Sequence, residues 1–330
     1  MAVHGDPAAA GQYPPQLIPA SAAVWFRNLV LYRLPPGWSL TASQLEDKLA
    51  SRPLKPCAAF EMFSRGWVAA APDGRLLHTL NQHHLLALGV EQKLLPASII
   101  RQEALRRARL KEDSQGFPVG KRQMRELKMR VTEELRARAL ARQRSTRAWI
   151  DPQGGWCVVD AASAGRAEEL IETLRDTLGS FAVRCVQTRH SAHGSMAAWL
   201  TQGNAPGQLA LDQDLTLMSA DGSRSSVRYT RHALDLREIR SHLQAGKYPV
   251  QLGLSWNDRV AFMLTEKLAL KRVQFLDLEP DAEPAAPADE PSDPQEKFDA
   301  DFALMTGELK RLLDEVLQSL GGETQIAAAA

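Results

Sequence analysis

The sequence predicts an α+β protein with antiparallel or mixed sheets, a protruding helical arm and a C-terminal helix. Short β-rich segments bounded by Pro/Gly turns lie on both sides of a helical middle region, so strands and helices do not alternate regularly. Near the C-terminus, apolar residues recur at three- and four-residue steps, which is typical of an amphipathic helix. The 330 residues are enough for two or more cores of ordinary domain size.

The first quarter of the chain is interpreted as a leader followed by the first part of a central α+β domain. Residues 1–23 are rich in Ala, Pro and Gly, and we expect a disordered leader there. Residues 24–93 form the first part of the domain, in which Thr41 and Gln44 make a capping-box pattern that begins a short helix. Strands are expected at residues 24–34, 66–69 and 83–90.

A basic helical arm is expected at residues 94–148. One helix begins at Pro96 and ends near Arg109, and a second spans residues 121–141 after a break at residues 115–118. The second helix carries one apolar stripe, made of Met124, Leu127, Val131, Leu135 and Ala139. Its other side is rich in arginine, which indicates a helical hairpin that packs only partly against the rest of the protein.

The remainder divides into three segments. Residues 149–278 continue the α+β domain, residues 279–297 are an acidic Pro-rich linker, and residues 298–330 hold the C-terminal amphipathic helix and tail. Strands are expected at 149–160 (a hairpin), 181–186, 226–232, 251–256, 260–264 and 271–275, and helices at 164–178, 236–245 and 302–320. Tryptophans are expected in the core at positions 25, 67, 149, 156, 199 and 256.

Charge is segregated along a chain that is nearly neutral overall, with 40 basic and 39 acidic residues. Residues 101–147 hold 15 Lys/Arg and 6 Asp/Glu, a net of +9, whereas residues 279–297 have a net of −6. A solvated helix with charge on its free face is one explanation, and an anion-binding surface is the other. At this point neither explanation is favoured.

Several functional classes are not indicated by any motif. The sequence has no run of about 18 apolar residues, no signal-peptide pattern, no P-loop, no Gly-x-Gly-x-x-Gly and no Gly-x-Ser-x-Gly. Three widely spaced cysteines, Cys57, Cys157 and Cys185, favour a reducing cytosol over a disulfide scaffold or thiolate zinc site. The histidine pairs have no third ligand nearby, so we expect neither a metal nor another cofactor.

Basic residues are the strongest functional signal. Lys121, Arg122 and Arg125 on the arm, and Arg228 and Arg231 on a later strand, have donors suited to phosphate oxygens. Phosphate contacts position a protein without reading sequence, and no base-reading motif is present. The residues alone therefore predict a non-specific nucleic-acid binder that is not an enzyme.

Two alternatives are kept. Asp299, Asp301 and Glu308 have the residue types of a two-metal nuclease site, although acidic residues near a helix start are more often caps. The helix at residues 302–320 is also a candidate surface for direct binding of a partner protein.

Six segments distributed along the chain form a recognisable set. They are Trp25-Phe26-Arg27-Asn28-Leu29, Arg65-Gly66-Trp67-Val68, Leu94-Leu95-Pro96, Trp149-Ile150-Asp151, Val159-Asp160-Ala161-Ala162-Ser163 and the block from Phe298-Asp299-Ala300-Asp301-Phe302 to Leu309. Together they resemble the bacterial recombination-associated RdgC family: they occur in the family's order and cover residues 24–323.

The resemblance implies a homodimer that closes into a ring through two different self-contacts, with a positive hole for duplex DNA. It implies DNA binding without sequence specificity, no nucleotide cofactor, and negative modulation of recombinase-driven recombination by occupation of the duplex. Single-stranded DNA stays open as a further ligand, and the location implied is the cytoplasm, at the nucleoid. Leu140 corresponds to an apolar dimer contact of the family, and Arg231 and His232 correspond to a basic-polar pair near the other contact.

Overall fold

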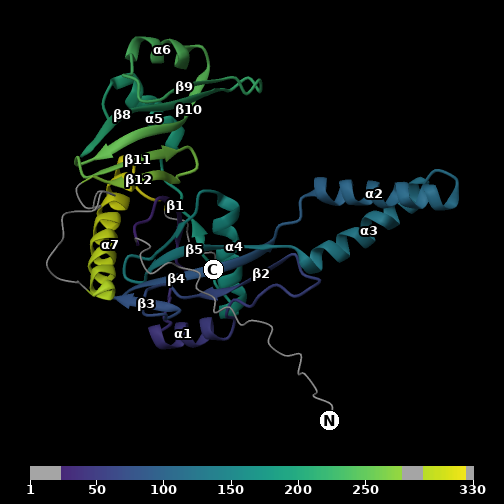
Figure 1. Ribbon diagram of the computed structural model, residues 1–330. Helices are drawn as coiled ribbons and strands as arrows, with labels where there is room; N and C mark the ends of the chain where they lie inside the picture. Colours follow the sequence, from purple (N-terminus) through teal and green to yellow (C-terminus); the bar gives the residue numbers. More distant parts are fainter. Residues whose placement is uncertain (1–23, 277–292, 325–330) are drawn as a thin grey trace, which may run out of the picture.

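The protein is an α+β fold built on one large antiparallel sheet, as the sequence predicts (Figure 1). The computed structural model describes residues 24–276 and 293–324. Its helices are α1 Ala42–Ala50, α2 Ala97–Gln115, α3 Lys121–Arg138, α4 Ala164–Leu178, α5 Ala192–Gln202, α6 Leu236–Gln244 and α7 Pro294–Ser319. Its strands are β1 Asn28–Arg33, β2 Phe63–Val68, β3 Leu77–Leu80, β4 His83–Lys93, β5 Ala141–Asp151, β6 Trp156–Asp160, β7 Arg184–Cys185, β8 Leu209–Ser219, β9 Ser226–Tyr229, β10 Lys247–Trp256, β11 Val260–Thr265 and β12 Leu270–Phe275.

The sheet has two parts that join at β1 and β12. The central part has the order β2-β4-β5-β6-β1, and the upper part continues as β12-β11-β10-β8-β9, with β3 paired to β4 and β7 to β1. The junction is short, because only Asn28↔Lys271 and Leu29↔Leu270 are in register there. We call β8–β12 the upper sheet.

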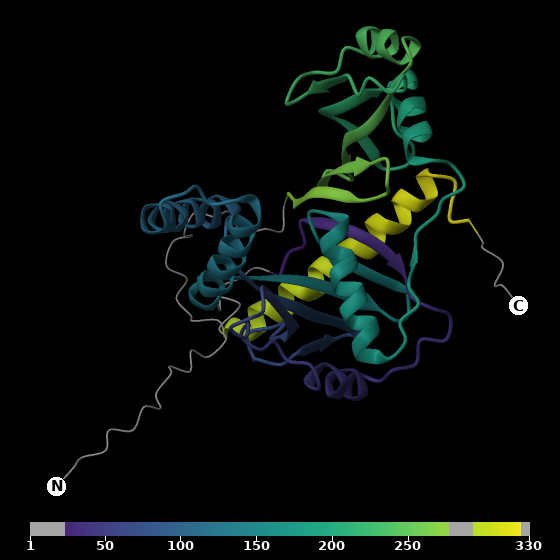
Figure 2. The ribbon, with the colours of Figure 1, turned by 90° about the vertical axis from the view of Figure 1, so that its right-hand side faces the viewer.

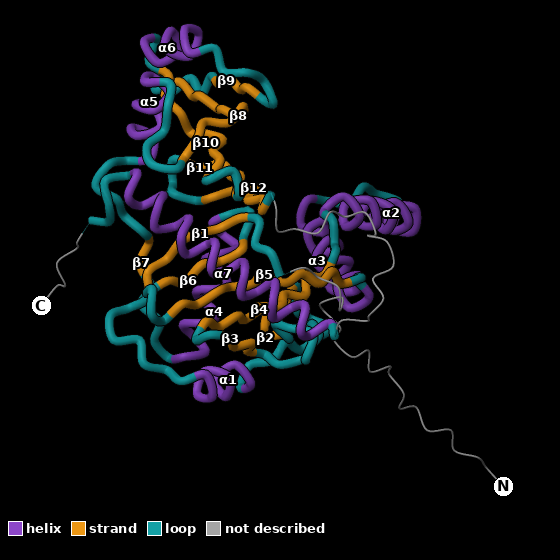
Figure 3. The backbone as a smooth tube through the Cα atoms, turned by 90° about the vertical axis from the view of Figure 1, so that its left-hand side faces the viewer, coloured by secondary structure: helices purple, strands orange, loops and turns teal. Residues whose placement is uncertain are grey.

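Two hydrophobic cores cover the two faces of the central part. Helix α7 lies across one face, and Figure 3 shows it crossing the side of the sheet nearest the viewer. Helices α1 and α4 cover the opposite face. The six tryptophans expected in the core are all buried, so those predictions are confirmed.

The upper sheet is covered on one face only among the described residues. Side chains that alternate along β10, such as Leu252 and Leu254, join the core shared with α5, α6 and α7. The residues between them, such as Gly253 and Ser255, point to the other face. We call that second face the open face. Leu29 and Leu270 belong to the α7 core, so the open face continues the α4 side of the central part.

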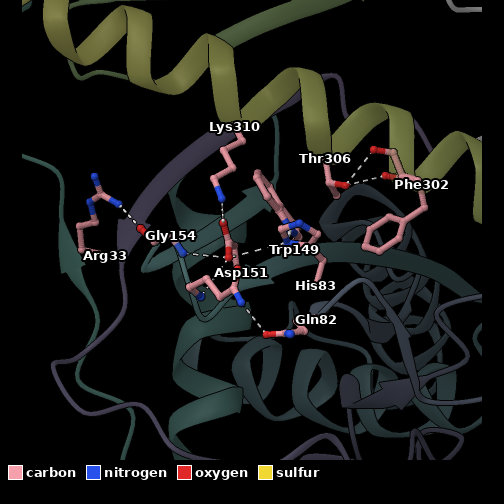
Figure 4. A network of polar contacts seen from close by, with 11 residues as sticks. Arg33, Gln82, His83, Trp149, Asp151, Gly154, Phe302, Thr306 and Lys310 are labelled. Carbon is pink, nitrogen blue, oxygen red and sulfur yellow. Dashed lines mark hydrogen bonds and ion pairs between the residues drawn. The ribbon is translucent and has the colours of Figure 1, made fainter.

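Helix α7 holds the two parts of the sheet together. From the upper part, Arg259 Nη2 lies 2.9 Å from the buried Glu308 Oε1. From the central part, the carboxylate of buried Asp151 lies 3.8 Å from Lys310 Nζ, and it accepts hydrogen bonds from two backbone N–H groups of its own turn (Figure 4). None of the described helices is long and apolar enough to cross a membrane.

Several predicted boundaries are wrong. The first arm helix extends to Gln115, and the second ends at Arg138, because residues 141–151 form a strand paired along β4. The predicted strand at 181–186 is only Arg184–Cys185. Helix α7 begins at Pro294, inside the predicted linker. The expected leader, most of the linker and the last six residues lie outside the described residues.

Candidate nucleic-acid interface

The arm cations predicted from sequence lie at the free end of a helical hairpin. Helices α2 and α3 project from the sheet, and the turn that joins them forms the tip (Figure 1). Lys121, Arg122 and Arg125 are exposed at the start of α3, directly after that turn. Cations at a helix N-terminus oppose the helix dipole, and the first turn has no acidic residue to offset them. Their placement therefore does not serve the stability of α3.

The three arm cations are not equivalent. Arg122 Nε lies 3.3 Å from Glu126 Oε1, although 93% of the Arg122 side chain is exposed. Lys121 and Arg125 make no ion pair within the described residues, so their charges are free for an anionic ligand.

Ion pairs between the helices stiffen the arm nearer to the sheet. Arg107 donates to Glu103 on its own helix at 2.8 Å and to Glu134 on α3 at 2.7 Å. Hydrogen bonds from Arg106 and Arg107 lower the pKa of Glu103 to about 2. The buried side chains Ala104, Ala108 and Val131 complete the arm's small core. The charges of Arg106 and Arg107 are thus paired with carboxylates, unlike those of Lys121 and Arg125 at the tip.

Arg228 and Arg231 lie on the upper sheet rather than on the arm. Arg228 is exposed on β9 opposite Thr216, and neighbouring Tyr229 points into the core, so Arg228 belongs to the open face. Arg231 follows the end of β9 and has a φ of 50°. Its backbone N–H donates to Asp214 Oδ1 at 2.8 Å. His232 is exposed, with Nδ1 2.8 Å from the carbonyl oxygen of Ala233.

The arm and the open face lie on the same side of the molecule. In Figure 1 α7 is on one side of the sheet and the arm projects to the other, and Figure 2 shows α4 in front of the sheet with α7 behind it. The open face continues the α4 side. The structure therefore presents both predicted groups of cations to one side without bringing them into contact.

Leu140 lies at the root of the arm, between α3 and β5. Its side chain is 80% exposed, and its carbonyl oxygen accepts from the N–H of Leu94 at 2.7 Å. Exposed apolar side chains nearby include Leu94 and Phe60, whose carbonyl oxygen accepts from Arg136 Nη1. Leu140, which the resemblance assigns to a dimer contact, is thus exposed at the root of the arm, with exposed Leu94 hydrogen-bonded to it through the backbone.

Arg142 and Arg144 were missed as interface candidates. They precede Ala148 and Ile150 at two-residue steps, so they lie on the α4 side of β5. Arg144 pairs with Glu169 of α4 at 2.6 Å, whereas Arg142 is exposed. The two-residue spacing of the arginines was the available signal, but both residues were assigned to the helical arm predicted at 94–148, beyond the end of its second helix at 141.

The carboxylates of the nuclease alternative do not converge. Asp299 accepts from Gln295 Nε2 at 2.7 Å and lies 3.6 Å from His78 Nε2 beside β3. Glu308 instead forms ion pairs with Arg259, in the turn between β10 and β11, and with Arg311 of its own helix. The expectation that Asp299 and Asp301 cap a helix is also wrong, because the N-cap is Asp293. Within residues 24–276 and 293–324, no group of three His, Cys, Asp or Glu side chains has the arrangement of a metal site.

Comparisons with known proteins agree on one family. A family model described as "Putative exonuclease, RdgC" matches residues 24–323. "Recombination-associated protein RdgC" of Dechloromonas aromatica (strain RCB) is 45% identical over 304 residues, which are 91% of this chain and 98% of that relative. Its namesake from Herminiimonas arsenicoxydans is 42% identical, covering 91% of this chain and 99% of the relative. The Burkholderia cenocepacia protein of the same name is also 42% identical, with 92% and 97% covered.

Proposed function

Because the chain belongs to the RdgC family of recombination-associated proteins, we propose that it binds double-stranded DNA through its phosphates without reading sequence. As a dimer closed into a ring around the duplex, it would limit access of the bacterial recombinase and thereby modulate recombination negatively. This function places the protein at the nucleoid. Single-stranded DNA is a second ligand to be tested with the same assay.

One observation carries the proposal: exposed cations without acidic partners lie at the arm tip and on the open face, both on the same side of the sheet. Lys121 and Arg125 are free at the tip, and Arg228 makes no ion pair within the described part of the chain. Release of counterions from DNA by such side chains is favourable and independent of sequence. A duplex that touches both groups would lie between the arm and the upper sheet.

The ring requires two self-contacts per subunit, and each would be isologous. The exposed apolar side chains of Leu140 and Leu94 at the root of the arm support one contact. Exposed His232, next to Arg231, is our candidate for the second. Apolar surface of this kind is worth about 25 cal/mol per Å² when it is removed from water.

The DNA-binding test is fluorescence anisotropy with labelled 30-base-pair duplexes of unrelated sequence, titrated at several salt concentrations. The slope of log affinity against log salt, divided by about 0.9, counts the phosphates neutralised. We expect a steep slope that is the same for all sequences. No binding, or binding confined to one sequence, would refute the proposal.

The ring test uses Leu140→Asp, a substitution at an exposed position that should not affect folding. Since two contacts join the subunits, loss of one should open the ring without separating the dimer. Light scattering of the variant should still give the dimer mass. At raised salt the variant should dissociate from closed circular DNA as readily as from linear DNA, whereas a closed ring should stay on the circle. Equal retention of the variant and the unaltered protein on circles would exclude Leu140 from the closure.

We further propose that DNA is bound without hydrolysis. The description of the family model names an exonuclease, so the test must include free DNA ends. Linear and circular duplexes incubated with Mg²⁺ or Mn²⁺ should stay intact. Shortening of the linear substrate, abolished by Asp299→Ala, would establish the nuclease alternative instead.

Direct binding of a recombinase through α7 is less well supported. Its apolar stripe, including Phe302, Leu309 and Val316, is buried against the sheet, so it is not free to dock a partner. A pull-down of purified recombinase after nuclease treatment would separate direct contact from co-occupancy of DNA.

A further inference from the structure

A bulge in β8 brings this strand unusually close to β10 on the open face of the upper sheet. Three residues of β8, Asp212, Gln213 and Asp214, lie opposite the single residue Gly253 of β10. A Cβ atom at position 253 would lie 3.1 Å from the carbonyl oxygen of Asp214 and 3.2 Å from its Cβ atom. Glycine therefore allows the bulged strand to lie tightly against its neighbour, with Asp214 fixed above the sheet.

A second bulge occurs in β12, which is separated from β8 by β10 and β11. Arg272 and Val273 lie opposite the single residue Phe262 of β11, because Ala261 pairs with Gln274 and Met263 with Lys271. Arg272 has a φ of 52°, in the left-handed region that residues with a side chain rarely adopt. Its side chain is 57% exposed, whereas that of Val273 is buried in the core. The extra residue thus turns an arginine out of the sheet.

Asp214 connects Arg272 to Arg231, whose backbone has the same left-handed conformation. Its Oδ1 accepts from the backbone N–H of Arg231 at 2.8 Å, and its Oδ2 lies 3.4 Å from Arg272 Nη1. Both arginines have left-handed φ angles, of 50° and 52°. Non-glycine residues keep such angles only where surrounding contacts enforce them, and such residues concentrate at functional sites. A single carboxylate therefore sets the position of two cationic residues.

These groups line a hollow of about 570 Å³ on the open face. Side-chain hydrogen-bond donors around it come from Gln213, Thr230, Gln274 and the two arginines, and the carboxylates of Asp212 and Asp214 also line it. Arg231 has no ion pair in the part of the chain that the structure describes. The geometry has room for a tetrahedral anion beside Arg272 and Arg231, on the side of the molecule where the arm lies.

We propose that this hollow is a phosphodiester subsite in which Arg231 and Arg272 contact one DNA phosphate and Asp214 is their positioning residue. The proposal rests on the proposed DNA binding and assigns it a contact point separate from the arm. Arg272 is the new ligand, and Asp214 acts only through the arginines. A phosphate here would be held by two forked donors, which suit its geometry.

The direction in which the DNA affinity changes when Asp214 is replaced shows whether this carboxylate positions the arginines or only repels the DNA. If Asp214 were only an acidic neighbour of the DNA, its removal should strengthen binding, because one repulsive charge disappears. If it positions the arginines, Asp214→Ala should weaken binding despite the gain in net positive charge. Asp214→Asn keeps an oxygen that accepts the N–H of Arg231, so it should recover part of the affinity.

The experiment uses the full-length protein and the labelled 30-base-pair duplex at several salt concentrations. Arg272→Ala should lower the affinity, and Arg231→Ala/Arg272→Ala, which leaves the phosphate without a cation, should lower it about 5-fold per protomer at about 0.15 M salt and reduce the salt slope by about 0.9. Asp214→Ala should produce a loss in the same direction, with a smaller slope than the unaltered protein. Arg237→Ala is the matched control, because it removes an exposed arginine of α6, which covers the opposite face.

Failure of this inference can be told apart from failure of the proposed function. If the unaltered protein does not bind duplex DNA, the proposed function fails. If it binds, but Arg272→Ala behaves like Arg237→Ala or Asp214→Ala binds more tightly, the subsite is refuted while DNA binding stands. The salt slope guards against misfolding, since partial unfolding lowers the active fraction without changing the slope of the rest.

Discussion

Removal of the free cations at the arm tip is the most direct test of the interface. In Lys121→Ala/Arg125→Ala, two exposed charges without acidic partners are lost from each arm. Arg122 is left in place because Glu126, 3.3 Å away, already offsets part of its charge, so its removal would change the net charge at the tip less clearly. Alanine favours helix, and fewer cations at the start of α3 suit its dipole, so the fold should be unaffected or slightly more stable.

The size of the effect follows from counterion release. Each phosphate contact contributes about 0.9 to the salt slope, which corresponds to about 5-fold in affinity at about 0.15 M salt. Two contacts on one arm therefore predict a slope lower by about 1.8 and an affinity lower by about 30-fold. If both arms of a closed dimer touch the same duplex, the slope should fall by about 3.6 and the loss should approach 1000-fold. The measured slope thus also reports how many arms are engaged.

The assay is anisotropy at four or more salt concentrations between about 0.05 and 0.3 M, where counterion release is measurable. Lys48→Ala/Arg237→Ala is the control, because it removes two cations from α1 and α6, away from the arm. The control should change the slope little. If the arm variant and the control give the same slope and affinity, the arm does not contact DNA and the reasoning is refuted.

Two further predictions concern stability. Burial beside Phe298 and Phe302 lowers the pKa of His78 below 6.5, and this effect outweighs the opposite effect of Asp299. Because the folded state disfavours the protonated ring, the urea midpoint should fall as pH drops from 7.5 through 6.5 towards 5. The fall should be less steep in His78→Gln. An equal pH dependence in the variant would contradict this assignment. Asp151→Ala should lower the free energy of unfolding by about 2–4 kcal/mol, since it removes a buried carboxylate and leaves two partly buried N–H groups of its turn without that acceptor. Asp151→Asn should recover most of this loss. Urea denaturation would show the difference, and an unchanged midpoint in Asp151→Ala would disprove it.

The sequence predicts helix ends and tight turns correctly where neighbouring residues alone determine the backbone. The capping box at Thr41 is present with both of its hydrogen bonds, and the helix predicted to end at Gly179 does so with a left-handed φ of 82°. The hairpin between β10 and β11 turns at Asn257 and Asp258, both with positive φ, as such a tight turn requires. In each case a few neighbouring residues determine the backbone.

The prediction failed where pairing with distant residues decides the structure. Residues 139–144 contain good helix formers, yet β4 pairs with Ala141 and the residues after it, and this tertiary pairing overrides helix propensity. Strand β8 was missed because Asp212, Gln213 and Asp214 interrupt its apolar alternation. The early start of α7 did have a local signal, Asp293 before Pro294, which was outweighed by the acidic and Pro-rich composition around it.

The candidate interface was only half visible in the sequence for the same reason. Lys121 and Arg125 stand out in a run of basic residues, whereas Arg272 is a single arginine in a strand, and only a bulge opposite Phe262 turns it outward. A strand is recognised in the sequence by side chains that alternate between its two faces, and a residue that a bulge has moved out of this alternation gives no such signal.

Features that are unfavourable for folding occur at two places on one side of this protein. At the arm tip, cations occupy the positive end of a helix, and on the open face two arginines keep left-handed backbones around Asp214. Each conflicts with a local rule of stability, and the described contacts offset the conflict only in part. Local rules are broken most often at functional sites. An anion at the arm tip would offset the unfavourable charge at the start of α3, and an anion on the open face would contact the two arginines that the strained backbone turns outward. A phosphate chain lying between the arm and the upper sheet would therefore account for both features with one ligand.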